Sequence, residues 1–329
     1  MAPGGSLGAA LLAWGRCLVL GLGLALGARL REQQSLGAVM VLVSRPWDKP
    51  RGNRRCFFNT SMASLATHWY PWNPYPVYLL SVGKWSRTEK TTIRRTWPLD
   101  FHFIDITRVF DDAFPPGLQL ADNGTLGTLA YKKMVSFKLK GFTLLPELKS
   151  YRYIMNLDDD SCLLDPIRYD MFQEMRSVGS VYAYPHIFLD KPNVIVGLKD
   201  FVESYMTENR LAWANPALRN LTLAWNKTAL AFYGNLDIID TVRWQKADIQ
   251  DFVGAVIASN NIWHRRWSDS PIKYWMAQMF WTKDQVSHYC DFDFQHSSWQ
   301  LLTMCNSRTN VDAVLKSLRG FWDDCSHHC

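Results

Sequence analysis

Apolar runs of strand length alternate along the chain with segments whose apolar residues recur at helical spacing. Residues 37–43, 75–81 and 101–106 are short runs rich in branched and aromatic residues, and they predict strands. Residues 84–96 predict a loop and a helix, and residues 130–140 predict a second helix. This alternation predicts the α/β class, with a mostly parallel central sheet flanked by helices.

The run from Tyr151 to Ser161 predicts a strand that ends in three carboxylates, Asp158, Asp159 and Asp160. Open α/β sheets bind ligands at the carboxyl ends of such strands. Two interpretations are open at this point. The acids could form a solvated turn, because Asp favours turns. They could also form a divalent-metal site, because Mn²⁺ and Mg²⁺ prefer carboxylate oxygens.

The second half of the chain continues the same alternation. Strands are predicted within 178–184 and 232–239, and the latter carries Asp237 among apolar neighbours. A helix is predicted over 198–208, and the polar residues 209–229 predict a long surface excursion.

Amphipathic helices are predicted over 241–257 and again from Ser270, which would cap a helix with Pro271 in its first position. Asp269 then has a structural explanation, since an acid is favoured at a helix N-terminus, beside a functional one. His296 follows an aromatic run, and a lone histidine is more often structural than a ligand. Only a spatial partner would make it a ligand.

Composition narrows the class of protein. The chain has 329 residues, of which 48% are hydrophobic and 14% aromatic, enough for a large core and against extended disorder. The net charge is +6, but lysines and arginines are scattered and never form a run of five. We therefore expect no nucleic-acid partner.

The N-terminus predicts entry into the secretory pathway. Residues 7–28 are mostly Leu, Gly and Ala, and at about 1.5 Å per residue they would just span a bilayer core of about 30 Å. Arg16 interrupts them, so a cleaved signal built on 17–28 is the alternative to a single-pass anchor. We expect residues 1–34 to be a signal-anchor with a short stem that associates with a membrane, and residues 35–329 to be a lumenal domain.

Cysteines and sequons agree with an oxidising compartment. Beyond Cys17, six cysteines could form disulfides. Within the tail 320–329, Cys325-Ser-His-His-Cys329 could instead bind zinc, but it lacks the usual spacing, so a disulfide-tied tail is expected. Acceptor sequons for N-glycosylation begin at Asn59, Asn123, Asn220 and Asn226.

Several blocks between Ala38 and His296 carry a family pattern. The first are a strand ending near Arg45, Tyr-Pro at 75–76, Tyr131-Lys-Lys-Met134 and Tyr151-Arg-Tyr153, followed by the acids. Phe232-Tyr-Gly-Asn-Leu-Asp-Ile238 is similar to Phe-Trp-Ser-Asn-Phe-Glu-Ile, and Arg266-Trp-Ser-Asp-Ser-Pro271 to Arg-Trp-Gly-Asp-Ala-Pro. Together these blocks resemble the fungal Golgi α-1,2-mannosyltransferase family, glycosyltransferase family 15.

The resemblance implies a type II membrane enzyme of the Golgi or another secretory compartment, with a GT-A-like glycosyltransferase fold. Such an enzyme uses Mn²⁺, with Mg²⁺ as an alternative, to transfer mannose from GDP-mannose to a glycan or glycoprotein hydroxyl with retention of configuration. The implied metal ligands are Asp158, Asp160 and His296. The implied catalytic acids are Asp237, as nucleophile or electrostatic partner near the anomeric carbon, and Asp269 on the acceptor side. The implied donor-binding residues are Arg45, Tyr153, Arg266 and Trp267.

The chain also departs from the family pattern. Asp158 and Asp237 stand where the family has Glu, Asp159 stands where it has Pro, and Asn260-Asn261 replace paired glycines. Each Glu-to-Asp change shortens the reach of a carboxylate by about one C–C bond. Transfer of galactose, glucose or xylose, and a non-catalytic lumenal glycan-binding relative, therefore remain alternatives.

Overall fold

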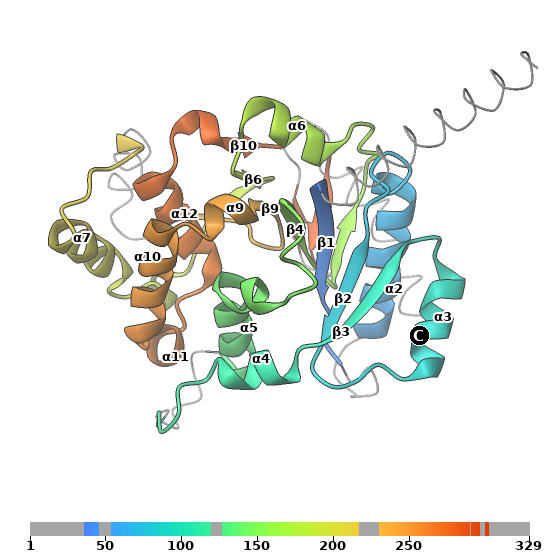
Figure 1. Ribbon diagram of the computed structural model, residues 1–329, viewed down its shortest axis with the longest axis horizontal. Coiled ribbons are helices and arrows are strands. Elements are labelled where there is room, and N and C mark those ends of the chain that lie inside the picture. Colours follow the sequence, from blue (N-terminus) through green and yellow to red (C-terminus); the bar gives the residue numbers. More distant parts are fainter. Residues whose placement is uncertain are drawn as a thin grey trace, which may run out of the picture.

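The computed structural model of the chain describes residues 36–45, 54–119, 127–216, 230–289, 291–296 and 300–302. A central seven-stranded sheet runs through the molecule, with helices on both of its faces (Figure 1). Its strand order is β10-β6-β9-β4-β1-β2-β3. The strands are β1 (Gly37–Leu42), β2 (Val77–Ser81), β3 (Phe101–Asp105), β4 (Tyr153–Asp158), β6 (Tyr182–Tyr184), β9 (Leu236–Asp240) and β10 (Val286–His288).

The sheet is mixed, and β9 is its antiparallel member. β1 pairs in parallel with β2 and β4, and β2 with β3, whereas β9 runs antiparallel to both β4 and β6. The predicted α/β class and the central sheet flanked by helices are confirmed. The register between β4 and β9 places Asn156 opposite Asp237.

Alternation along the strands divides the apolar core into two layers. In β1, Ala38 and Met40 face one layer, while Val39 and Val41 face the other. The helices are α2 (Arg54–Ser64), α3 (Arg87–Thr96), α4 (Thr107–Asp112), α5 (Leu129–Leu139), α6 (Met171–Val178), α7 (Leu198–Glu208), α9 (Thr241–Trp244), α10 (Ala247–Ala258), α11 (Asn261–Arg265) and α12 (Asp269–Phe280). Helices α5, α10 and α12 supply side chains to the first layer, and α2 and α6 to the second.

Short elements complete the fold. β5 (Ser161–Leu163), β11 (Phe294–His296) and β12 (Gln300–Leu302) form a second sheet, and β7 (Ile187–Leu189) pairs with β8 (Leu230–Phe232). A π-helical turn covers Leu65–Trp69, and 3₁₀ turns cover Gly141–Leu144, Pro192–Val194 and Lys283–Gln285.

Three predicted elements have different bounds in the structure. The strand predicted over 178–184 shrinks to β6, because α6 runs to Val178 and ends at Gly179 in the left-handed region. The helix predicted over 241–257 is divided into α9 and α10, because the backbone of Lys246 between them is extended. Helix α12 begins at Asp269 rather than at Pro271, and the first turn of a helix tolerates proline.

Some predictions for the termini and cysteines fall outside the described residues. These include the anchor in 1–34, the tail 320–329 and most of the excursion over 209–229. The structure describes no helix with the length and apolar character needed to span a bilayer. Cys56 is disulfide-bonded, whereas Cys162 is buried and free, so Cys162 does not pair as the cysteine count suggested.

A close approach between β1 and α6 requires a glycine at position 37. A Cβ atom there would lie 2.1 Å from a ring carbon of the buried Phe172. We expect Gly37→Ala to lower the free energy of unfolding by about 1–3 kcal/mol, the usual effect of overpacking. Urea denaturation of the two proteins measures this difference.

Gly254 in α10 is the matched control, since a Cβ there would meet no atom within 4 Å. Gly254→Ala should be neutral or stabilise by about 0.4–1 kcal/mol. Equal stability of Gly37→Ala and the wild type would contradict the close packing of β1 on α6.

Candidate active site

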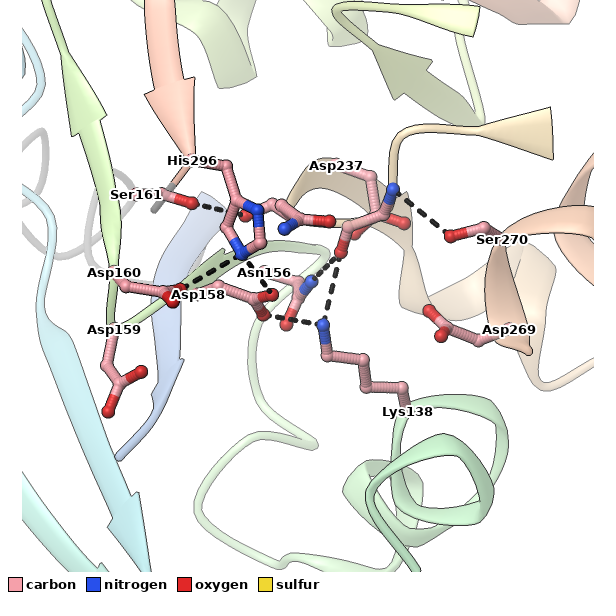
Figure 2. A network of polar contacts seen from close by, with 12 residues as sticks. Lys138, Asn156, Asp158, Asp159, Asp160, Ser161, Asp237, Asp269, Ser270 and His296 are labelled. Atoms are coloured by element: carbon pink, nitrogen blue, oxygen red, sulfur yellow. Dashed lines mark hydrogen bonds and ion pairs between the residues drawn. The ribbon is translucent and has the colours of Figure 1, made fainter. Parts of the chain in front are cut away.

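The acidic end of β4 meets His296 at one point of the structure. Asp158 is the last residue of β4, Asp160 lies in the turn that follows, and β11 pairs antiparallel with β5 so that His296 lies opposite Ser161. His296 Nε2 is 3.0 Å from Asp160 Oδ1 and 3.6 Å from Asp158 Oδ2 (Figure 2). One ligand atom from each residue lies within 4.8 Å of the other two. The histidine thus has the spatial partners that a ligand requires.

The two acids and the histidine perturb one another electrostatically. Burial lowers the pKa of His296, but its hydrogen bond to Asp160 and the charges of Asp160 and Asp158 outweigh that effect and raise it. Burial raises the pKa of Asp158, although Lys138 and His296 oppose the shift. The Asp160 pKa is lowered, because interactions with His296 and Arg54 outweigh burial. A divalent cation would offset the electrostatic cost of burying the two carboxylates, and it would displace the proton of His296.

Asp159 makes contacts that are separate from those of Asp158 and His296. Its Oδ2 accepts a hydrogen bond of 2.7 Å from the backbone N–H of Ser44, and Arg54 lies 3.6 Å from Oδ1. Burial and the nearby Asp160 raise its pKa to about 7. Asp159 therefore joins the turn after β4 to the end of β1.

Lys138 is a buried cation beside the candidate metal ligands, and the sequence patterns did not identify it as functional. Its Nζ donates to Asp158 Oδ1 at 2.6 Å and to the Gly234 carbonyl at 3.2 Å. The Asn156 side chain donates to the same carbonyl at 2.8 Å. The position of Lys138 in line with apolar residues at helical spacing was the available signal, because a buried lysine needs a partner.

Asp237 and Asp269 share a second buried lysine. Lys273 Nζ donates to Asp237 Oδ2 at 2.6 Å and lies 3.2 Å from Asp269 Oδ2. Tyr182 donates a hydrogen bond of 2.9 Å to the same Asp237 oxygen. Asp237 has no exposed surface, while the Asp269 side chain is 6% exposed. Asp269 is thus both an acid in the first turn of α12 and a neighbour of Asp237.

The four residues predicted to bind the donor lie in different surroundings. The Arg45 guanidinium lies 4.2 Å from the Trp85 ring centroid and pairs with Glu89 at 3.5 Å, next to Ser44. Arg266 lies 4.3 Å from the Tyr131 ring centroid.

Two of these donor-binding residues belong to the core. Trp267 is buried, and its indole donates to the Val196 carbonyl. Tyr153 is fully buried at the opposite end of β4 from Asp158, roughly 16 Å away at about 3.3 Å per residue, and its ring stacks with Phe172. Tyr153 is therefore corrected from a donor ligand to a core residue.

The donor set at the end of β4 fits a divalent cation. Two carboxylates and an imidazole suit manganese, which accepts oxygen and nitrogen ligands. Charge agrees with this: three cations face five carboxylates in this part of the described structure, so two negative charges are left over when all five acids are ionised and His296 is neutral. The cations are Lys138, Lys273 and Arg54, and the acids are Asp158, Asp159, Asp160, Asp237 and Asp269.

Sequence comparison finds relatives among fungal mannosyltransferases. The probable mannosyltransferase KTR4 of Saccharomyces cerevisiae is 24% identical over 201 residues, which cover 56% of this chain and 43% of that protein. The O-glycoside alpha-1,2-mannosyltransferase homolog 4 of Schizosaccharomyces pombe is 20% identical, covering 80% and 69% of the two chains. This chain thus spans less than half the length of KTR4.

Two solved structures share the fold. Core-mannan synthase A from Aspergillus fumigatus, in an Mn/GDP form, superposes with a TM-score of 0.68 at 15% identity, over 83% of this chain and 79% of its own. The mannosyltransferase Ktr4p of S. cerevisiae gives a TM-score of 0.66 at 18% identity, over 84% and 74%. The family model described as glycolipid 2-alpha-mannosyltransferase matches residues 118–316. The chain therefore belongs to the glycolipid 2-alpha-mannosyltransferase family, glycosyltransferase family 15.

Proposed function

We propose that this chain is a metal-dependent retaining α-mannosyltransferase that moves mannose from GDP-mannose to a hydroxyl of a glycan or glycoprotein. The observation that carries the proposal is the convergence of Asp158, Asp160 and His296 at the carboxyl end of β4 in a member of this family. A neighbour in fold is described with manganese and GDP, and another with GDP, which supports this metal and this nucleotide.

Manganese bound at this point would act as a Lewis acid toward the departing diphosphate. Asp158, Asp160 and His296 would hold it, and Tyr233 would orient the imidazole through its contact of 3.2 Å with Nδ1. Lys138 adds a fixed positive charge beside the leaving group.

Retention requires that the acceptor oxygen joins the anomeric carbon on the face from which the diphosphate leaves, or that two inversions occur. In the single-step route the acceptor O–C bond forms as the C–O bond to the diphosphate breaks, and the acceptor proton passes to a diphosphate oxygen. In this proposal Asp269 takes the acceptor-side role that the family pattern implies, and the charge of Asp237 stabilises the positive character of the sugar ring.

The cellular setting follows the same reasoning. We propose a single-pass type II protein of the Golgi or another secretory membrane, anchored by residues 1–34, with the catalytic domain in the lumen. The disulfide at Cys56 supports an oxidising compartment. The exposed sequon at Asn59 on α2 is compatible with it.

A second candidate is transfer of another hexose or a pentose from a nucleotide donor. It is favoured by the shorter acids at positions 158 and 237, which alter carboxylate reach at both sites. A lumenal glycan binder without catalysis is the competing class of protein.

A panel of GDP- and UDP-sugars tested with the full chain separates these functions. We expect Mn²⁺-dependent hydrolysis or transfer with GDP-mannose and little with UDP-galactose, UDP-glucose or UDP-xylose, measured as nucleotide diphosphate release. Turnover restricted to a UDP-sugar would replace mannose as the donor. No binding of any sugar nucleotide with Mn²⁺ present would favour the glycan binder.

Asp158→Asn tests the metal site, because the change keeps the shape of the side chain and removes its charge. We expect Mn²⁺-dependent transfer to fall by at least about 10²-fold, the scale of losing one electrostatic contributor to catalysis. Isothermal titration should show weaker Mn²⁺ binding, while the thermal midpoint shows a folded protein. Near-normal Mn²⁺-dependent turnover in this variant would remove Asp158 from the ligand set.

Tyr233→Phe tests the orientation of His296. Loss of a hydrogen bond to the second nitrogen of a ligating histidine typically weakens metal binding by about 10–100-fold, and we expect Mn²⁺ affinity by titration to fall by about tenfold. Tyr78→Phe is the matched control, since it loses a 3.0 Å hydroxyl contact with Tyr151 away from the acids. Equal Mn²⁺ affinity in both variants would show that Tyr233 does not orient the ligand.

A further inference from the structure

We propose that Lys273 is a positioning residue that holds Asp237 as a fixed, buried negative charge, so that Asp237 acts through its field and not as a covalent nucleophile. This inference rests on the proposed function and deepens it, because it chooses between the two routes to retention. Neither Lys273 nor Tyr182 belongs to a sequence block that carried the family resemblance.

The first step of the argument is the burial of the pair. The side chains of Asp237 and Lys273 are 0% and 1% exposed, and Nζ lies 2.6 Å from Oδ2. By contrast, Asp158 and His296 are 24% and 23% exposed at the candidate metal site. A nucleophile must reach the anomeric carbon of a donor bound at the accessible acids. Asp237 has no exposed surface and is enclosed by protein.

The second step is the way in which the Asp237 carboxylate is held. Both of its hydrogen bonds, from Lys273 and from Tyr182, end on the same oxygen, Oδ2. The other oxygen, Oδ1, is buried without a hydrogen-bond partner among the described residues. Tyr182 is itself immobilised, since its ring stacks 5.3 Å from Trp281. The carboxylate is thus fixed from one side by two donors that belong to packed elements.

The third step is the link to Asp269. Lys273 lies one turn after Asp269 on α12 and is 3.2 Å from its Oδ2. One lysine therefore faces the acid assigned to the sugar and the acid assigned to the acceptor. Asp237, Asp269 and Lys273 together carry one net negative charge. Helix α12 holds two of these three groups, Asp269 and Lys273, in fixed positions. Preorganised charge of this kind stabilises a cationic transition state without any movement during the reaction.

The pKa shifts of Lys273 and Tyr182 agree with a positively charged Lys273. Burial lowers the pKa of Lys273, but Asp237 and Asp269 outweigh burial and raise it, while Lys138 opposes them. Tyr182, whose pKa is raised by burial and by Asp237, stays neutral and donates a hydrogen bond to the carboxylate. The Lys273 side chain therefore carries its positive charge across the pH range in which transferases are assayed.

The experiment compares Lys273→Met, Asp237→Asn and the double variant with the wild type. We expect each single variant to lower kcat by about 10²-fold or more, while KM for GDP-mannose and Mn²⁺ affinity by titration change by less than about threefold. Lys273→Met leaves the buried Asp237 and Asp269 without their lysine and should melt at a lower temperature, whereas Asp237→Asn keeps the pair of Lys273 with Asp269. The double variant should melt above Lys273→Met without regaining activity, which separates positioning from a merely structural role.

Controls and trapping complete the test. Gln278→Met changes another fully buried polar residue of α12 to the same side chain and should keep kcat within about twofold. After incubation with donor alone, mass spectrometry of wild-type protein should find no hexosyl group on the peptide that contains Asp237.

Three outcomes are distinguishable. A hexosyl adduct on Asp237 would overturn the inference by showing a nucleophile, and so would normal kcat in a folded Lys273→Met or double variant. Absence of transfer by the wild type from any sugar nucleotide would instead overturn the proposed function.

Discussion

The cost of burying carboxylates beside one another governs the architecture of this site. Four acids converge at the carboxyl end of β4, on the neighbouring β9 and at the first residue of α12, and like charges brought together where water is excluded repel strongly. Two buried lysines offset this repulsion, Lys138 from α5 and Lys273 from α12. A buried charge left without its partner is strongly destabilising, so each lysine fixes the position of its helix against the sheet. The packing of α5 and α12 on the sheet and the electrostatics of the site therefore depend on each other.

The antiparallel strand β9 makes this arrangement possible. Because it pairs with β4 in a register that sets Asp237 opposite Asn156, the two strands bring their polar side chains to the face that α5 and α12 cover. The turn before β9 contributes as well. The Gly234 carbonyl accepts hydrogen bonds from Lys138 and Asn156, and a Cβ at this position would meet Ser270 Oγ at 2.9 Å. A glycine lets the turn approach the N-terminus of α12 closely enough to join the two lysine clusters.

Local patterns predicted the elements and the acids but not the pairings between them. The strands β1, β2 and β4 follow from continuous apolar runs, and the helices α5 and α12 from apolar residues at helical spacing. The pairing of β11 with β5, which brings His296 to Asp160, depends on contacts between distant segments, and so does the partner of each buried lysine. Strand alternation argues against a donor role for Tyr153. Along a strand Tyr153 shares its face with Met155 and Leu157, opposite to the face that carries Asp158.

The replacement of Glu by Asp at position 237 acquires a physical meaning beside Lys273. A longer acid extends its carboxylate by about one C–C bond away from the strand, whereas Asp237 keeps its carboxylate between Tyr182 and Lys273 within the core. The Asp237 carboxylate therefore reaches less far than that of a glutamate but carries the same negative charge. Transition-state stabilisation by a fixed charge requires only that the charge be oriented and desolvated, because the low local dielectric strengthens its field. A shorter acid tethered by a lysine satisfies that requirement, and it is compatible with a single-step retaining transfer in which the acceptor attacks beside the leaving diphosphate.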